Sequence, residues 1–168
     1  MDEKDELTRQ AESGDVRAQL ELGHEYYFDK DYMQAEYWYK KAAEGGDLYA
    51  QKSLAGLYAY HLKDYSKSLL WWRKAAEKGD RQAQYELGRM YEFGEGVPRN
   101  HENAVSWWKL SAEQGHELAE YCIGCECKSL YLMTGDAKAK EQGLYWLQRA
   151  YEHGCKKAQP VYIALLYH

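Results

Sequence analysis

Residues that favour β-strands are scarce in this sequence, and so is proline. The 168 residues include four valines, two isoleucines, two threonines and two prolines, against 19 alanines and 18 leucines. Valine, isoleucine and threonine are typical of strands, whereas alanine, leucine, glutamate, lysine and glutamine favour helices. The composition therefore predicts an all-α protein, and it argues against a sheet enzyme of the dinucleotide-binding or hydrolase kind.

The sequence also lacks a long apolar run and an excess of positive charge. Its mean hydropathy is −0.82, and 22 basic against 27 acidic residues give a formal net charge of −5. We therefore expect no membrane-spanning segment, no membrane partner and no nucleic-acid partner. The start, MDEKDELTRQ, has acids where a secretory signal needs bases before an apolar stretch, which predicts a cytoplasmic protein.

What the sequence does contain is an internal repeat. Glycines recur at 14, 46, 79, 115 and 154, and each is followed four residues later by alanine. Eight residues after the first four glycines come Leu22, Leu54, Leu87 and Ile123, and nine after come Gly23, Ala55, Gly88 and Gly124. Eight residues before the last four glycines stand Trp38, Trp71, Trp107 and Trp146. Periods of this length are typical of helical repeat proteins.

The spacing within one repeat predicts two amphipathic helices, A and B. Positions 4, 8 and 12 after the glycine share one face of helix A, and the small residue at position 9 permits close approach of a neighbouring helix. In helix B the tryptophan and the alanine four residues later form a similar stripe. The pairs Gly14-Asp15, Gly46-Asp47 and Gly79-Asp80 predict a helix end followed by an N-cap, and Asp31, Asp64 and Asn100 are the N-caps expected for B helices.

The pattern G-D-x-x-A-Q-x-x-L-G-x-x-Y, followed by A-x-x-W-W/Y-x-x-A-A-E-x-G, resembles the Sel1-like repeat family of the tetratricopeptide-like superfamily. Its clearest copy is GDRQAQYELGRMYEFGEGVPRNHENAVSWWKLSAEQG, which starts at Gly79. The fourth copy departs most, with Gly143 at an alanine position and an extended connection, LYLMTGDAKAK. The resemblance implies a right-handed α-solenoid of antiparallel helix pairs, used as a scaffold or adaptor for other proteins. It also implies a bacterial source.

On this basis we expect one solenoid over residues 1–168, with about ten helices. Residues 1–13 form an N-terminal capping helix, and residues 154–168 form a C-terminal one. The repeats between them cover about 14–45, 46–78, 79–114 and 115–153.

In such arrays the A helices line the concave surface, so positions off the buried stripe are free to bind. Tyrosine and arginine, which are enriched at protein interfaces, are common at these positions. The predicted partner-binding residues are Arg17, His24, Tyr27, Tyr49, Lys52, Tyr60, Gln82, Tyr85, Arg89, Glu92, Tyr121 and Lys128. Packing between adjacent A helices is the competing explanation for any single tyrosine. Because these positions include basic side chains although the protein as a whole is acidic, we expect the partner to bind through an extended segment that carries acidic residues.

Four cysteines offer the best candidate for a metal site, but their spacing does not support one. Cys122, Cys125 and Cys127 lie on one helix and point in different directions, and Cys155 is distant in sequence. A zinc site needs four converging ligands, so core packing is the better interpretation. We expect no metal, no cofactor and no disulfide framework.

No catalytic constellation emerges either. Ser106-Trp-Trp-Lys109 matches the S-x-x-K pattern of penicillin-recognising enzymes but lacks its companion motifs. None of the six histidines forms a known catalytic or metal motif. The sequence therefore predicts a protein that is not an enzyme.

Two further hypotheses stay open beside the adaptor. The first is an immunity protein that neutralises a bacterial toxin effector, and the second is an enzyme acting on β-lactams or cell-wall fragments. The apolar C-terminal stretch VYIALLYH also predicts a second contact surface, with a homodimer interface as one use.

Overall fold

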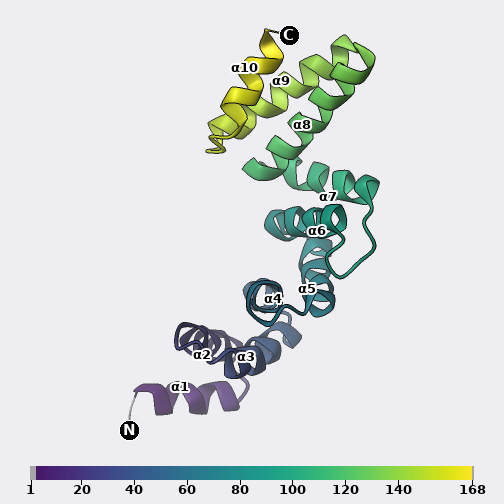
Figure 1. Ribbon diagram of the computed structural model, residues 1–168. Coiled ribbons are helices and arrows are strands. Elements are labelled where there is room, and N and C mark those ends of the chain that lie inside the picture. Colours follow the sequence, from purple (N-terminus) through teal and green to yellow (C-terminus); the bar gives the residue numbers. More distant parts are fainter. Residues whose placement is uncertain (1–2, 168) are drawn as a thin grey trace. The chain divides into compact units, whose positions relative to one another are not determined.

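A computed structural model describes residues 3–167, and every regular element among them is helical. Figure 1 shows their order along the chain. The helices are α1 (Glu3–Glu12), α2 (Val16–Phe28), α3 (Tyr32–Glu44), α4 (Leu48–Leu57), the π-helix η1 (Tyr58–Leu62), α5 (Tyr65–Glu77), α6 (Arg81–Phe93), α7 (His101–Glu113), α8 (Glu117–Thr134), α9 (Ala137–Glu152) and α10 (Ala158–Leu166). The even-numbered α-helices correspond to the predicted A helices and the odd-numbered ones to the B helices, so the all-α solenoid is confirmed.

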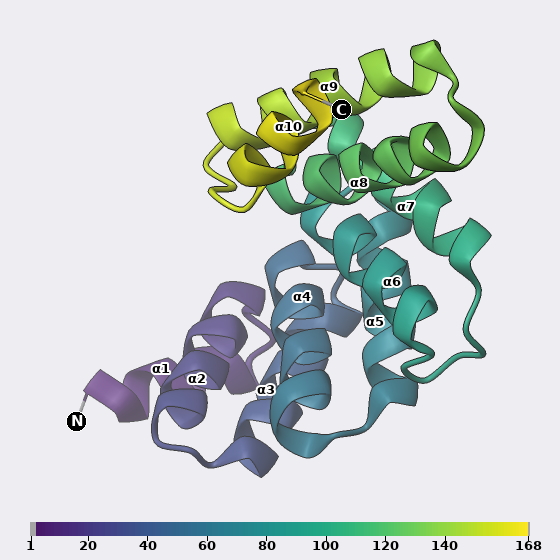
Figure 2. The ribbon, with the colours of Figure 1, turned by 45° about the horizontal axis from the view of Figure 1, so that its top comes forward.

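The described chain forms two compact units. Unit 1 contains residues 3–75 with Glu95–Val97, and unit 2 contains Ala76–Gly94 with 98–167. In unit 1, α1 packs on α2, α2 on α3, and α3 on α4. In unit 2 the same order continues from α6 to α10, and antiparallel pairs such as α8 and α9 are plain in Figure 2. Within each unit, the helices named here therefore pack against their neighbours along the chain.

The predicted helix ends are confirmed by capping geometry. Gly14, Gly46 and Gly79 have φ of +99°, +93° and +90°, which side-chain-bearing residues rarely adopt. The aspartate after each glycine accepts a hydrogen bond from the amide of the repeat alanine, at 2.7–2.8 Å. Asp31, Asp64 and Asn100 cap the B helices in the same way. Local sequence thus fixes where these six helices begin.

The close approach of a neighbouring helix predicted at position 9 also occurs. A β-carbon added to Gly23 would lie 2.5 Å from the Tyr39 ring, and one added to Gly88 would lie 2.5 Å from the Trp108 ring. Each of these rings belongs to the residue directly after the repeat tryptophan, Trp38 or Trp107. Trp38 is buried as expected, whereas Trp107 is only half-buried. The B-helix stripe therefore includes a residue next to the predicted tryptophan.

The prediction of an extended connection in the fourth repeat is wrong, because most of that segment is helical. Residues 130–134 continue α8 and residues 137–140 begin α9, so that only Gly135 and Asp136 separate the two helices. Gly135 adopts φ +71°, and Asp136 caps α9 through the amide of Lys138. The inserted residues contain leucine, alanine and lysine, which favour helix. They lengthen α8 to 18 residues and α9 to 16, against 13 for α6 and α7.

A glutamine joins successive repeats. The side-chain amides of Gln19, Gln51 and Gln84 are buried and donate to the backbone oxygens of Ala11, Ala43 and Ala76, at 3.0–3.3 Å. Each bond runs from the first turns of an A helix to the last turn of the preceding B helix. Each of these carbonyls also accepts a backbone amide, that of Gly14, Gly46 or Gly79, so the glutamine adds a second hydrogen bond at the helix end.

The terminal helices fall within the expected capping segments. Helix α1 packs on α2 through Ala11 and Leu7, and α10 packs on α9 around Leu165. Residues 155–157 form a turn before α10 rather than part of the helix. Residues 1–2 and His168, which the prediction also assigned to these caps, lie outside the described residues.

Candidate binding surfaces

The twelve predicted binding residues lie on the A helices and η1, six in each unit. In unit 1 they are Arg17, His24, Tyr27, Tyr49, Lys52 and Tyr60, which we call the unit 1 surface. In unit 2 they are Gln82, Tyr85, Arg89, Glu92, Tyr121 and Lys128, which we call the unit 2 surface. Nothing in their geometry tests partner binding, but it separates residues that are available from residues that are used in packing.

Exposed aromatic rings dominate the unit 1 surface. Tyr49 is 69% exposed and Tyr60 is 52% exposed, and the Lys52 ammonium lies 5.1 Å from the centre of the Tyr49 ring. Phe28, at the end of α2, is 78% exposed although it was not among the twelve residues. It occupies position 14 of its repeat, as Tyr60 does. Large exposed aromatic side chains are enriched where proteins bind one another.

Behind Phe28, Tyr27 belongs to an aromatic cluster. Its hydroxyl lies 2.9 Å from Nε2 of His61, and the His61 ring lies 4.3 Å from the ring of Tyr32. His61 is carried by the π-helix η1, whose changed register brings it toward α2. The repeat spacing gave no sign of this contact, because the other repeats have no π-helix. Tyr27 is therefore held in place rather than free to reorient.

The arginines of both surfaces are paired with glutamates on their own helices. Arg17 Nε lies 3.2 Å from Glu21, and Arg89 Nε lies 3.0 Å from Glu86. These pairs have i,i+4 and i,i+3 spacing, which the sequence alone could have indicated. They reduce the positive charge that the surfaces offer to an acidic segment. His24 packs edge-on against Tyr39, and burial lowers its pKa.

In unit 2, two of the predicted tyrosines serve packing. The Tyr85 ring stacks on the His116 ring, with 4.7 Å between the ring centres and 17° between the ring planes. The backbone oxygen of Tyr85 accepts a hydrogen bond from Trp108 Nε1 at 3.3 Å. Tyr121 is half-buried beside Cys125, and burial raises the pKa of its hydroxyl to about 12. The competing explanation, packing between helices, thus applies to both residues. Gln82 is exposed and Lys128 is half-buried.

Glu92 joins a charged cluster at the far end of α6. Its carboxylate binds Arg99 at 2.5 Å and Nδ1 of His101 at 2.7 Å, while Nε2 of His101 lies 3.1 Å from Glu126. These hydrogen bonds, with that to Glu92 the strongest influence, raise the pKa of His101, and the bond from His101 lowers the pKa of Glu92. The cluster joins α6, α7 and α8, so Glu92 is engaged within the protein.

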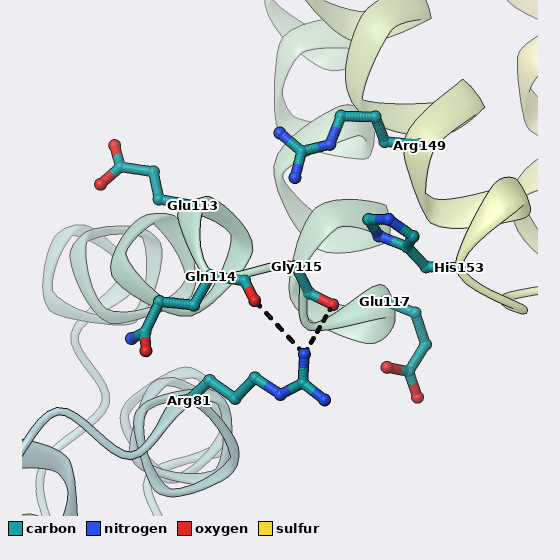
Figure 3. A pocket seen from close by; sticks show the side chains of 7 residues that line it. All are labelled: Arg81, Glu113, Gln114, Gly115, Glu117, Arg149 and His153. Carbon is teal, nitrogen blue, oxygen red and sulfur yellow. Dashed lines mark hydrogen bonds between the residues drawn. The ribbon is translucent and has the colours of Figure 1, made fainter.

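A polar pocket of about 520 Å³ lies at the helix ends of unit 2, and Figure 3 shows the residues around it. Arg81 reaches from the start of α6 and donates through Nη1 to the backbone oxygens of Gln114 and Gly115, both at 3.3 Å. Arg149 approaches from the last turn of α9, and His153 is the residue directly after that helix. None of these residues was predicted to be functional.

Arg149 and His153 at this pocket contact a buried carboxylate. Glu120 is fully buried, and its two oxygens lie 2.9 Å from Arg149 Nη2 and 2.8 Å from His153 Nδ1. Glu120 stands at the position that glutamine fills in the three preceding repeats, a departure that the sequence displays. A carboxylate cannot donate to the preceding helix as glutamine does. Glu120 instead forms an ion pair with Arg149 of α9 and a hydrogen bond with His153, the residue after α9. Arg149 and His153 thus serve to fasten α8 to α9.

The residues weighed for chemistry lie in ordinary packing environments. Among residues 3–167, no three His, Cys, Asp or Glu side chains are placed to hold a metal ion. Cys122 and Cys127 pack against the core around Ile123, whereas Cys125 and Cys155 belong to the core around Leu147. Burial raises the pKa of Cys122 to about 12. The Ser106 hydroxyl donates to Glu102 O of its own helix at 2.8 Å. In the part of the chain described, no helix has the length and apolar character needed to cross a membrane.

Comparison with known proteins places the chain among repeat proteins. Its sequence matches the Sel1 repeat at residues 16–47, 49–80, 81–116 and 129–155. No curated protein matches the chain.

Solved structures with the same fold include two at 34% sequence identity. One is a protective antigen of uropathogenic Escherichia coli strains that displays an SLR fold (TM-score 0.78), and 92% of this chain aligns with 34% of that one. The other is a Sel1 repeat protein from Oxalobacter formigenes (TM-score 0.81), with 91% of this chain aligned to 45% of that one. The chain thus spans less than half the length of either protein. YrrB, a TPR protein with an unusual peptide-binding site, shares the fold at 21% identity (TM-score 0.54, 97% of this chain and 83% of that one).

Proposed function

Because the chain belongs to the Sel1 repeat family, whose fold generally mediates protein–protein interaction, we propose that it is a non-catalytic scaffold or adaptor for a partner protein. The observation that supports this most is the exposure of Phe28, Tyr49 and Tyr60 on neighbouring A-type elements of unit 1. Packing explains Tyr85 and Tyr121 in unit 2, but it does not explain rings that are more than half exposed.

The proposed contact is a protein segment that covers these three rings. Aromatic side chains bury a large area at low cost in side-chain entropy, so they often dominate binding energy. The nearby Tyr27 is held by its hydrogen bond to His61, which lowers the entropy cost of binding further. Lys52, placed over the Tyr49 ring, supplies a positive charge beside the aromatic surface. The segment therefore combines apolar side chains with an acid.

Affinity capture from the native host, followed by titration of the identified partner, tests the proposal. The variant Phe28→Ser, Tyr49→Ser, Tyr60→Ser should weaken the partner's affinity by about a hundredfold, which corresponds to about 2.7 kcal/mol. The control is Met33→Ser, Tyr37→Ser, Leu70→Ser, which alters side chains on B helices that are 48–69% exposed. Equal affinity for the first variant and the unmodified chain would overturn the proposed surface.

A narrower form of the proposal is an immunity protein that neutralises a bacterial toxin in the cytoplasm. The formal net charge of −5 favours association with a basic toxin. A toxin gene next to this one, whose product is lethal alone and harmless when both are expressed, would support this role. Survival that does not depend on this chain would reject it.

The predicted homodimer contact through α10 is a separate proposal. Ile163 and Tyr167 are exposed, and a groove of about 350 Å³ beside Tyr151 and Tyr162 lies between α9 and α10. Sedimentation equilibrium of the chain and of Ile163→Lys tests it, since a dimer that depends on this surface should dissociate in the variant. A monomer at all concentrations would reject it.

A further inference from the structure

The turn between α8 and α9 carries exposed apolar side chains. Leu130, Leu132 and Met133, at the end of α8, are 45%, 51% and 77% exposed. They lie in the segment that lengthens α8 and α9 beyond the helices of the third repeat. We call Leu130, Leu132, Met133 and residues 134–138 the α8–α9 tip. Figure 2 shows this turn at one end of the α8–α9 pair.

The tip is a short turn held by hydrogen bonds. Thr134 Oγ1 donates to Leu130 O at 2.7 Å, Gly135 N donates to Tyr131 O at 2.7 Å, and Asp136 accepts from the amide of Lys138 at 2.9 Å. Both helix ends are therefore capped. Exposed apolar side chains on a preformed end need no further ordering of the backbone when they become buried. Clustered exposure of this kind marks a contact surface.

Lysines stand near the apolar residues. Residues 127–140 contain Lys128, Lys138 and Lys140 against a single acid, Asp136, in a chain whose formal net charge is −5. At a rise of about 1.5 Å per residue, Lys128 lies roughly 6 Å behind Leu132 along α8. Lys140 lies one turn behind Asp136 on α9, with its ammonium 5.4 Å from the centre of the Tyr131 ring. Apolar side chains thus occupy the end of the pair, and two of the three lysines lie one turn back.

From this arrangement we propose that the α8–α9 tip binds an anionic lipid surface. Leu130, Leu132 and Met133 enter the boundary between headgroups and acyl chains, and the lysines reach the phosphates. Interfacial segments of proteins combine apolar burial with flanking cations, which contact the headgroups through flexible stems. One small tip gives reversible binding rather than permanent attachment. The proposal is independent of the unit 1 surface, and it departs from our expectation of no membrane partner, which rested on the absence of a spanning segment.

Co-sedimentation of the full chain with vesicles tests the proposal. One set contains equal parts of phosphatidylcholine and phosphatidylglycerol, and the other contains phosphatidylcholine alone. Binding should occur on the anionic set, should be at least about tenfold weaker on the neutral set, and should fall in about 1 M salt, where the Debye length is about 3 Å.

Two variants separate the apolar and ionic contributions. Leu130→Ser, Leu132→Ser, Met133→Ser and, separately, Lys128→Gln, Lys138→Gln, Lys140→Gln should each weaken binding about tenfold or more. The matched control Phe93→Ser, Leu110→Ser, Tyr151→Ser changes side chains of the same unit that are 45–68% exposed, and it should bind as the unmodified chain does. Circular dichroism checks that every variant keeps its helical content.

Absence of binding to anionic vesicles would overturn the proposal, as would an equal loss in the control. If vesicles are not bound and the tip variants instead lose a captured protein, the tip belongs to a protein interface.

Discussion

The ring of Tyr39 lies against Gly23 so closely that a β-carbon on Gly23 would come within 2.5 Å of Cδ1. Tyr39 is 2% exposed, so its ring has no room to withdraw. The contact joins helix A to helix B of the first repeat. It explains why a small residue recurs nine positions after the repeat glycine.

Gly23→Ala should lower the free energy of unfolding by about 1–3 kcal/mol, the usual cost of overpacking a closed contact. Urea denaturation followed by circular dichroism measures the change. The control is Gly56→Ala, also in an A helix of unit 1, where the new β-carbon would lie 3.9 Å from Tyr60. That variant should be neutral or more stable by up to about 1 kcal/mol, because alanine favours helix over glycine. Equal effects of the two changes would contradict the packing argument.

Replacing Arg149 should lower the free energy of unfolding more than replacing Glu120, the carboxylate that it binds. In Arg149→Met the buried carboxylate of Glu120 keeps only His153, and breaking a buried ion pair on one side costs roughly 3 kcal/mol. In Glu120→Gln the position regains the residue of the other repeats, which can donate to Ala112 O, so we expect a loss below about 1 kcal/mol. Thermal unfolding of both variants measures the two losses of stability. A larger loss in Glu120→Gln than in Arg149→Met would contradict the role given to Glu120.

His101 should titrate above the ordinary value, and His24 and His116 below it. The carboxylates of Glu92 and Glu126 raise the pKa of His101, whereas burial lowers the pKa of His24 and His116. Chemical shifts of the imidazole protons as a function of pH measure the order directly. A His101 pKa at or below the ordinary value of 6.5 would contradict the bridging geometry.

The same bridge should make stability depend on pH. Because the folded-state pKa of His101 is raised, its stabilisation is complete below about 6.5 and is lost as the pH rises through the raised value. The side chain is 48% exposed, so solvent screening keeps the effect below about 1 kcal/mol. His101→Gln should remove this pH dependence and leave stability at high pH nearly unchanged.

Cys122 should resist alkylation in the folded protein. Burial raises the pKa of its thiol to about 12, so little of the reactive thiolate is present near pH 8. Timed labelling with iodoacetamide and mass spectrometry should show Cys122 reacting at least about tenfold faster in denaturant than in buffer. Equal rates in the two conditions would indicate that the thiol is accessible in the folded protein.

Much of the fold follows from residues close together in the sequence. The caps at Asp15 and Asp47, and the buried alanines, are local features that recur with the repeat. The α8–α9 turn was mispredicted because length relative to the other repeats was taken as a sign of a loop, although the segment contains only one glycine and no proline. Helix propensity of the inserted residues outweighed that comparison.

The candidate surfaces were less predictable, because a residue's position in the repeat does not determine which side chains it contacts. Tyr27 meets His61 only because η1 shifts the register of the second repeat. Tyr85 and Tyr49 occupy A helices alike, yet one stacks on His116 and the other is exposed. Neighbouring side chains, rather than the repeat pattern, decide which tyrosines remain available.

The buried glutamines have a consequence for how such a chain can grow. Gln51 is bonded to a carbonyl only eight residues earlier in the sequence, so the fastening of one repeat to its predecessor is encoded almost entirely within the junction. A duplicated segment that starts at one repeat glycine and ends before the next therefore carries the glutamine donor near its start and the acceptor carbonyl near its end. The acceptor of one copy can then bind the glutamine of the next. The chain can thus gain a repeat by tandem duplication without inventing a new contact.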